Sequence, residues 1–150
     1  MMTIRKAIAT AGGIGYIRKG AGSVAAAVYC LLWWCTPLGD AAFWQLAAVL
    51  PVLVIGILSA GAVENEWGPD SHKVVIDEVA GMLITLLFMA PTLVHMIAGF
   101  VLFRFFDIVK PLGIRKTEGL PGGWGVMADD VLAALYSLAI LQTLVYLKLL

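Results

Sequence analysis

Four long uncharged segments separate short charged clusters along this chain of 150 residues. The segments cover residues 20–39, 41–63, 79–103 and 131–147. A helix that crosses the roughly 30 Å hydrocarbon core of a bilayer needs about 20 apolar residues. The first two segments meet this length, and the last meets it if one helical turn is added before it. The pattern therefore predicts an all-α fold, a polytopic helical bundle in a membrane.

The segment 79–103 contains Pro91 at its middle, which favours two helices rather than one. Helical character is expected from about Val75 to Val109, which is too long for a single ordinary crossing. Proline ends a helix because it lacks an amide N–H and clashes with the preceding turn. The sequence thus predicts about five membrane helices, including a short hairpin centred on Pro91.

The distribution of basic residues agrees with this hairpin. Cytoplasmic loops of membrane proteins collect Lys and Arg. With the hairpin, every basic cluster lies on one side of the membrane, whereas a single crossing would place Arg18 and Lys19 opposite Lys110. We therefore expect the N-terminus and the charged clusters to face the cytoplasm.

Composition supports one membrane-embedded domain over residues 1–150. The hydrophobic fraction is 61%, against about 45–50% in soluble domains. Ten basic and ten acidic residues cancel, so no net field attracts nucleic acid, and the expected partner is the membrane. No feature of the pattern specifies an oligomeric state. Cys30 and Cys35 match no metal or redox motif, and Trp33, Trp34 and Trp44 are typical of an interfacial aromatic belt.

Charged residues crowd into the stretch from Phe103 to Asp130, between two apolar segments. Arg104 and Asp107 are three positions apart on an expected helix, so they project from one face. Lys110 follows just before Pro111, which ends the helix. Ionisable residues near a bilayer core are costly and mark functional sites. A structural ion pair is the alternative explanation.

Two adjacent acidic pairs, Asp77-Glu78 and Asp129-Asp130, are each expected to open an apolar helix. Acidic residues also stabilise helix N-termini by capping and through the macrodipole, which is the alternative explanation here. Four or five carboxylates at one membrane face, without paired His or Cys ligands, favour Mg²⁺ over Zn²⁺. The glycines at 122 and 123 would let backbone amides approach an anion. His72 is a candidate for proton transfer.

Three motifs in order closely resemble the phosphatidylglycerophosphatase A family. They are IDEVAGM (76–82), FRFFDIVKPLGIR (103–115) and GGWGVMADDVLA (122–133). The resemblance implies a Mg²⁺-dependent membrane phosphatase that converts phosphatidylglycerophosphate to phosphatidylglycerol and phosphate, the step before cardiolipin in bacterial lipid synthesis. The chain departs from the family at Arg18-Lys19-Gly20, where the family often has Pro-Gly-Thr. A threonine hydroxyl is lost there, and two basic residues are added that could serve phosphate or anionic-lipid binding.

The residues and the resemblance together give the expected site. Mg²⁺ is the expected cofactor and an anionic phospholipid the expected substrate. Direct attack by water and attack by a carboxylate both stay open. The expected catalytic residues are Asp77, Glu78, Asp107 and Asp130; the metal ligands Asp77, Glu78, Asp107, Asp129 and Asp130; and the phosphate-binding residues Arg104, Lys110, Arg115, Lys116, Gly122 and Gly123.

Two other classes of protein also group acids in membrane helices. A CDP-alcohol phosphatidyltransferase would carry a long Asp-rich signature within one helix, and this chain has none. A small transporter or ion-binding protein would place acids in the middle of its helices. Here the acids gather at helix ends, which favours the phosphatase.

Overall fold

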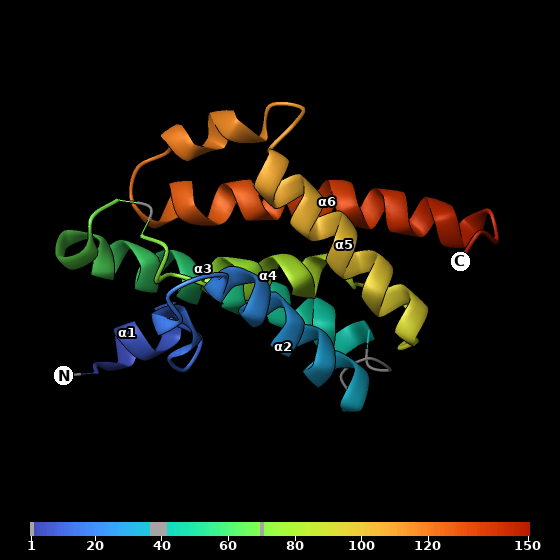
Figure 1. Cartoon of the computed structure of the whole chain (residues 1–150), viewed down its shortest axis with the longest axis horizontal. Coiled ribbons are helices and arrows are strands. Elements are labelled where there is room, and N and C mark those ends of the chain that lie inside the picture. Colours follow the sequence, from blue (N-terminus) through green and yellow to red (C-terminus); the bar gives the residue numbers. More distant parts are fainter. Residues whose placement is uncertain (1, 37–41, 70) are drawn as a thin grey trace.

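The computed structural model describes residues 2–36, 42–69 and 71–150, and within these ranges the fold is entirely helical, as predicted. The cartoon in Figure 1 shows long helices packed lengthwise, with the short N-terminal helix at one end. The elements are α1 (Ile4–Ala9), η1 (Ile14–Tyr16), α2 (Ala21–Cys35), α3 (Ala42–Trp67), α4 (Ile76–Thr85), α5 (Leu93–Val109), η2 (Ile114–Gly119) and α6 (Gly123–Tyr146).

Successive long helices run in alternate directions, so that their charged ends meet (Figure 1). One cavity is lined by residues from the starts of α2, α4 and α6 and from the end of α5. The end of α3 lies beside them, because Glu64 and Asp129 line a common smaller cavity. We call this the charged end of the bundle.

The predicted hairpin is present as α4 and α5, joined by a turn that contains Pro91. Thr92 caps α5, with its hydroxyl accepting a hydrogen bond from the His95 backbone N–H at 3.2 Å. The His95 ring Nδ1 lies 2.8 Å from the Ala90 carbonyl oxygen and closes the turn. His95 is buried, so it has a structural role in the hairpin turn.

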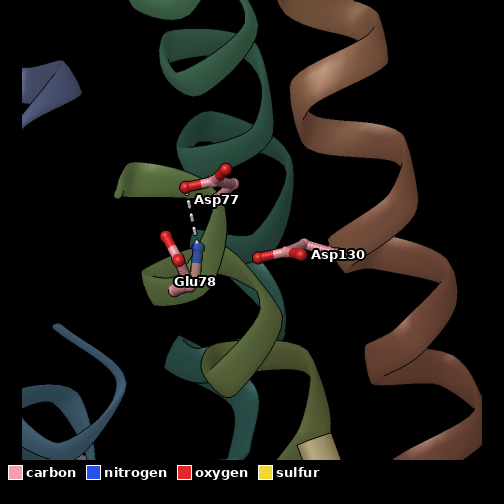
Figure 2. A group of neighbouring side chains, drawn as sticks. All are labelled: Asp77, Glu78 and Asp130. Carbon is pink, nitrogen blue, oxygen red and sulfur yellow. Dashed lines mark hydrogen bonds between the residues drawn. The ribbon is translucent and has the colours of Figure 1, made fainter. Parts of the chain in front are cut away.

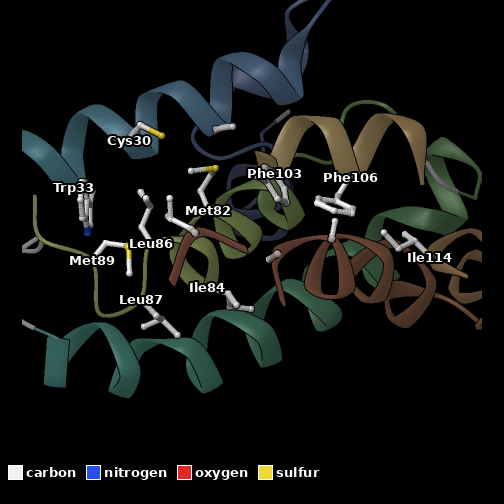
Figure 3. Close-up of a cluster of buried hydrophobic side chains, with 14 residues drawn as sticks. Cys30, Trp33, Met82, Ile84, Leu86, Leu87, Met89, Phe103, Phe106 and Ile114 are labelled. Atoms are coloured by element: carbon white, nitrogen blue, oxygen red, sulfur yellow. The ribbon is translucent and has the colours of Figure 1, made fainter. Parts of the chain in front are cut away.

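The core surrounds α4. Every residue from Ala80 to Leu87 is buried, which covers the second half of this helix and the start of the hairpin turn. Gly81 lets α5 approach closely, since a Cβ at this position would lie 2.4 Å from the Phe103 ring. Figure 3 shows Met82 and Ile84 of α4 close to Phe103 and Phe106 of α5 in one buried cluster. Trp33 also points from α2 into this cluster and is fully buried. Its assignment to an interfacial belt was therefore wrong, whereas Trp34 and Trp44 are exposed.

The outer faces of the bundle expose large apolar side chains, and exposing such surface to water is unfavourable. Helix α3 exposes Phe43, Trp44, Leu50 and Leu58, each by about two-thirds or more of its surface. Only 22% of the most apolar window of this helix is buried within the protein. Large contiguous apolar patches mark membrane or partner surfaces. The exterior therefore favours association with a membrane.

Two helices in the described ranges, α3 and α6, are long and apolar enough to cross a membrane. The prediction of about five membrane helices is thus not confirmed. Helix α4 has 10 residues, a length of about 15 Å, which is half the thickness of a typical hydrocarbon core. Helix α4 is therefore not among the helices that could cross a membrane by length.

The N-terminal segment folds against the charged end. The Thr3 hydroxyl caps helix α1 by accepting a hydrogen bond from the Lys6 backbone N–H. The Val75 N–H donates to the Ala9 carbonyl at 2.8 Å, and Lys6 forms an ion pair with Glu66 of α3. These contacts place the glycine-rich loop that follows α1 next to the start of α4.

Candidate functional site

A cavity of about 280 Å³ opens at the charged end of the bundle. Four helices and two loops contribute to its wall, and most of the polar side chains come from positions far apart in the sequence. Its lining residues are Ile17, Arg18, Gly20, Ala21, Gly22, Ser71, His72, Val74, Asp77, Glu78, Asp107, Lys110, Asp129 and Asp130.

A cluster of three carboxylates lies in the wall of this cavity. One oxygen from each of Asp77, Glu78 and Asp130 lies within 4.8 Å of the others. Figure 2 shows Asp77 and Glu78 at the start of α4, with Asp130 pointing toward them from α6. Asp77 Oδ1 accepts a hydrogen bond from the Glu78 N–H at 3.1 Å. Helix α6 thus brings Asp130 close to two acids that lie 52 and 53 positions earlier in the sequence.

Two oxygens of this cluster have unmet hydrogen-bonding capacity. Glu78 Oε2 and Asp130 Oδ2 are buried and accept no hydrogen bond from the described residues. A buried carboxylate oxygen without a partner is costly, and a bound cation would satisfy it. Hard divalent ions such as Mg²⁺ prefer oxygen ligands of this kind. The three carboxylates therefore fit a Mg²⁺ ion.

The electrostatics of α4 lead to the same conclusion. Burial raises the pKa of Asp77 well above its ordinary value, and the nearby charges of Glu78 and Asp130 raise it further. Burial also raises the pKa of Glu78. Each pKa is raised because the ionised form lacks enough water and positive charge. A divalent cation would supply that charge and allow the carboxylates to stay ionised together.

Arg104 on α5 holds two of the acids in place. Its Nη1 lies 2.5 Å from Asp107 Oδ2 and 3.7 Å from Glu78 Oε1. Arg104 and Asp107 share a helix face, as their spacing predicts. Asp107 lines the cavity, whereas Arg104 is not among its lining residues. The ion pair with Arg104 therefore holds Asp107 in the cavity wall. A role of Asp107 as a metal ligand stays a prediction.

Lys110 ends α5 in a left-handed conformation with a φ of 48°. This backbone conformation is rare for residues with a side chain and is often found at functional sites. The Lys110 Nζ atom lies 2.5 Å from Asp129 Oδ2. Both residues line the cavity. The structure thus joins Lys110 with Asp129 as a cation and anion pair beside the three-carboxylate cluster.

Helix α6 begins earlier than expected from the position of Asp129 and Asp130, which were predicted to open it. It starts at Gly123, so Asp129 and Asp130 lie in its second turn rather than at its opening. Capping therefore does not explain this pair. Gly123, the first residue of α6, packs closely on α3: a Cβ at this position would lie 2.0 Å from the Ile57 carbonyl oxygen. By contrast, Asp77 and Glu78 occupy the first turn of α4, as expected.

The other predicted phosphate-binding residues lie outside the cavity. Arg115 and Lys116 are exposed on η2. Gly122 lines an adjoining cavity of about 100 Å³ together with Glu64 and Asp129, and Gly123 contacts the α3 backbone. For these four residues, direct contact with phosphate stays a prediction.

The residues of the glycine-rich loop were not in the expected site, although Arg18 and Lys19 were noted as candidates for phosphate binding. In the structure Arg18, Gly20 and Gly22 line the cavity with Ser71 and His72. Gly22 lies so close to Glu78 that a Cβ would sit 1.7 Å from its Oε1. Two features of the sequence pointed to this loop: its series of glycines, which resembles a phosphate-cradling loop, and the departure from the family pattern at Arg18.

The cavity at the end of this helical bundle combines crowded carboxylates with cations that are paired to acids. Such a combination is typical of enzymes that act on phosphate esters. A model of the family described as phosphatidylglycerophosphatase A matches residues 7–145 of the chain. The chain belongs to this family, and it is a phosphatase.

Individual relatives agree with the family assignment. A protein of Bacteroides thetaiotaomicron named "putative phosphatidylinositol-3-phosphatase" is 41% identical over 87% of this chain and 86% of its own length. The phosphatidylglycerophosphatases A of Haemophilus influenzae and Escherichia coli K12 are 44% and 36% identical, over 51% and 65% of this chain and 48% and 60% of their own lengths. No solved structure matches the chain.

Proposed function

We propose that this protein is a Mg²⁺-dependent phosphatase that removes the terminal phosphate from phosphatidylglycerophosphate. The observation that carries the proposal is the cluster of Asp77, Glu78 and Asp130 around one point in the cavity. Membership of the family and the names of two relatives support the substrate. The reaction adds water across the terminal ester bond between phosphorus and oxygen, and it releases phosphatidylglycerol and phosphate.

The residues of the cavity would divide the work in the following way. Asp77, Glu78 and Asp130 would hold the ion, which when bound neutralises charge on the phosphoryl oxygens. Lys110, kept in place by Asp129, would contact the same oxygens, since a lysine near a phosphate acts as a fixed positive charge. Arg104 would orient the carboxylates of the cavity wall.

The start of α2 would add a second binding element for phosphate. This helix is capped by Gly20, whose missing side chain leaves the first-turn amides without a side-chain hydrogen bond. Ala21 and Gly22 line the cavity, so the positive end of the helix dipole faces it. Helix N-termini of this kind bind phosphate groups.

The size of the cavity suits a phosphorylated headgroup. Its volume of about 280 Å³ is near the lower limit of small-molecule sites, roughly 300–1,000 Å³. Such a space holds the polar part of a phospholipid and leaves the acyl chains outside. The apolar exterior of α3 and α5 would keep those chains in the surrounding membrane.

Purified protein is expected to release phosphate from phosphatidylglycerophosphate in detergent micelles with Mg²⁺. Removal of the ion by a chelator should lower the rate about 100-fold or more, and added Mg²⁺ should restore it. The measurement is released inorganic phosphate against time. Activity that persists in excess chelator would exclude a metal-dependent reaction.

The name of the Bacteroides relative supports a second candidate substrate, phosphatidylinositol 3-phosphate. Both lipids carry a phosphomonoester on a headgroup that is linked to the lipid through a phosphodiester. The same assay run with each lipid at equal surface concentration decides between them. We propose phosphatidylglycerophosphate as the preferred substrate, with a kcat/KM at least about tenfold higher.

The charged end of the bundle is proposed to face the cytoplasm of a bacterial inner membrane, with the protein crossing it several times. The support is the gathering of basic clusters at this end and the tendency of such clusters to stay inside.

Single cysteines test this topology in a variant without Cys30 and Cys35. Asn65→Cys lies at the charged end and Thr92→Cys at the hairpin turn, and both positions are exposed. In intact cells an impermeant thiol reagent should label Thr92→Cys, and it should label Asn65→Cys only after permeabilisation. The reverse pattern would place the charged end outside the cell.

A further inference from the structure

Arg18 is an arginine on the cavity wall. It lies on the exposed rim of the cavity. Among the side chains that the structure describes, no carboxylate forms an ion pair with it. The other cation of the wall, Lys110, is paired with Asp129. Arg18 therefore supplies positive charge at the mouth that no acid of the site neutralises.

The loop that carries Arg18 is held firmly. Thr10 is fully buried; its hydroxyl accepts a hydrogen bond from the Gly13 N–H at 3.0 Å, and its carbonyl accepts one from the Gly15 N–H at 3.0 Å. Gly15 rests on the Lys73 backbone, where a Cβ would lie 1.9 Å from the carbonyl oxygen. The Tyr16 ring packs edge-on against Trp67. The position of the loop at the cavity mouth is thus set before any ligand binds.

The proposed substrate carries two phosphates with different surroundings. The terminal phosphomonoester would lie at the carboxylate cluster, within the cavity. The phosphodiester follows one glycerol unit later and would lie nearer the mouth. An arginine can donate two parallel hydrogen bonds to the oxygens of such a group.

We propose that Arg18 forms a second phosphate subsite at the cavity mouth, which binds the phosphodiester of the substrate headgroup. This inference rests on the proposed function, because it takes a phosphomonoester at the carboxylate cluster as given. The subsite would select lipids whose phosphomonoester lies one short polyol away from a phosphodiester. Lys19 carries the same charge, yet it is not part of the cavity wall.

Arg18→Gln and Lys19→Gln form a matched pair that tests the subsite. Arg18→Gln should raise the KM for phosphatidylglycerophosphate about tenfold and change kcat less than about twofold. Lys19→Gln should leave both constants near those of the parent, because it removes the same surface charge away from the cavity.

Inhibition separates the two phosphates. Phosphatidylglycerol contains the phosphodiester alone, and inorganic phosphate resembles the phosphomonoester alone. Arg18→Gln should weaken inhibition by phosphatidylglycerol about tenfold and leave inhibition by inorganic phosphate unchanged. Equal effects of the two variants, or weaker inhibition by inorganic phosphate, would overturn the subsite. A parent protein inactive on phosphatidylglycerophosphate would instead overturn the proposed function.

Discussion

Asp130→Asn is expected to lower turnover about 1,000-fold, the largest effect of any single change. Asp130 is buried on α6, and one of its oxygens has no partner among the described residues. An amide binds a divalent cation weakly and carries no charge, so the three-carboxylate cluster would lose its ion. Initial rates of phosphate release, with Mg²⁺ varied over a wide range, measure the loss.

Stability should move in the opposite direction. Three buried carboxylates near one another repel when no cation is present. Asp130→Asn removes one of these charges, so the thermal midpoint of the metal-free protein should rise by a few degrees. Added Mg²⁺ should stabilise the parent protein and leave the variant almost unchanged.

Glu66→Gln is the matched control for this charge. Glu66 is an exposed carboxylate at the same end of the bundle, paired with Lys6. Its neutralisation should leave turnover within about twofold of the parent, since exposed ion pairs contribute little. If Asp130→Asn kept more than a tenth of the parent turnover, Asp130 would have no part in the chemistry.

Gly22→Ala is expected to lower turnover about 100-fold and to leave the fold intact. The added Cβ would lie 1.7 Å from Glu78 Oε1, so Glu78 must move away from the cluster. The atom it meets is the end of a flexible side chain, which can turn aside at little cost in stability. Ligands displaced by about 1 Å commonly cost two orders of magnitude in rate. Turnover and the thermal midpoint together measure the effect.

Gly119→Ala is the control, because nothing lies within 4 Å of a Cβ at that position. It should change neither turnover nor stability. The double variant Gly22→Ala with Glu78→Asp should recover part of the lost activity, since the shorter side chain leaves room for the methyl group. A fully active Gly22→Ala would show that the placement of Glu78 does not matter for the reaction.

Much of the fold follows from local features of the sequence. The uncharged runs and Pro91 were enough to predict the helices and the α4–α5 hairpin, because helix length and proline geometry are properties of the chain itself. The number of membrane helices was not confirmed. Only the structure shows that α4 stops after ten residues and that Phe88 takes a left-handed conformation, with a φ of 63°, before Pro91.

Part of the site was also predictable. The acidic pairs and Asp107 were all expected at one end of the bundle, and Asp77, Glu78, Asp107, Asp129 and Asp130 do line one cavity. Their grouping follows from alternation of helix direction, which the basic clusters already indicate. The pairing within the group could not be predicted, because it depends on which helix faces meet.

The sequence by itself determined that this is a helical protein with its acids and cations gathered at one end. Only the tertiary structure separated the three-carboxylate cluster from the ion pairs of Arg104 with Asp107 and of Lys110 with Asp129. It also brought the Arg18 loop to the cavity mouth. The physical reason is that helix periodicity sets which residues share a face, whereas the packing of one helix on another sets which faces share a cavity.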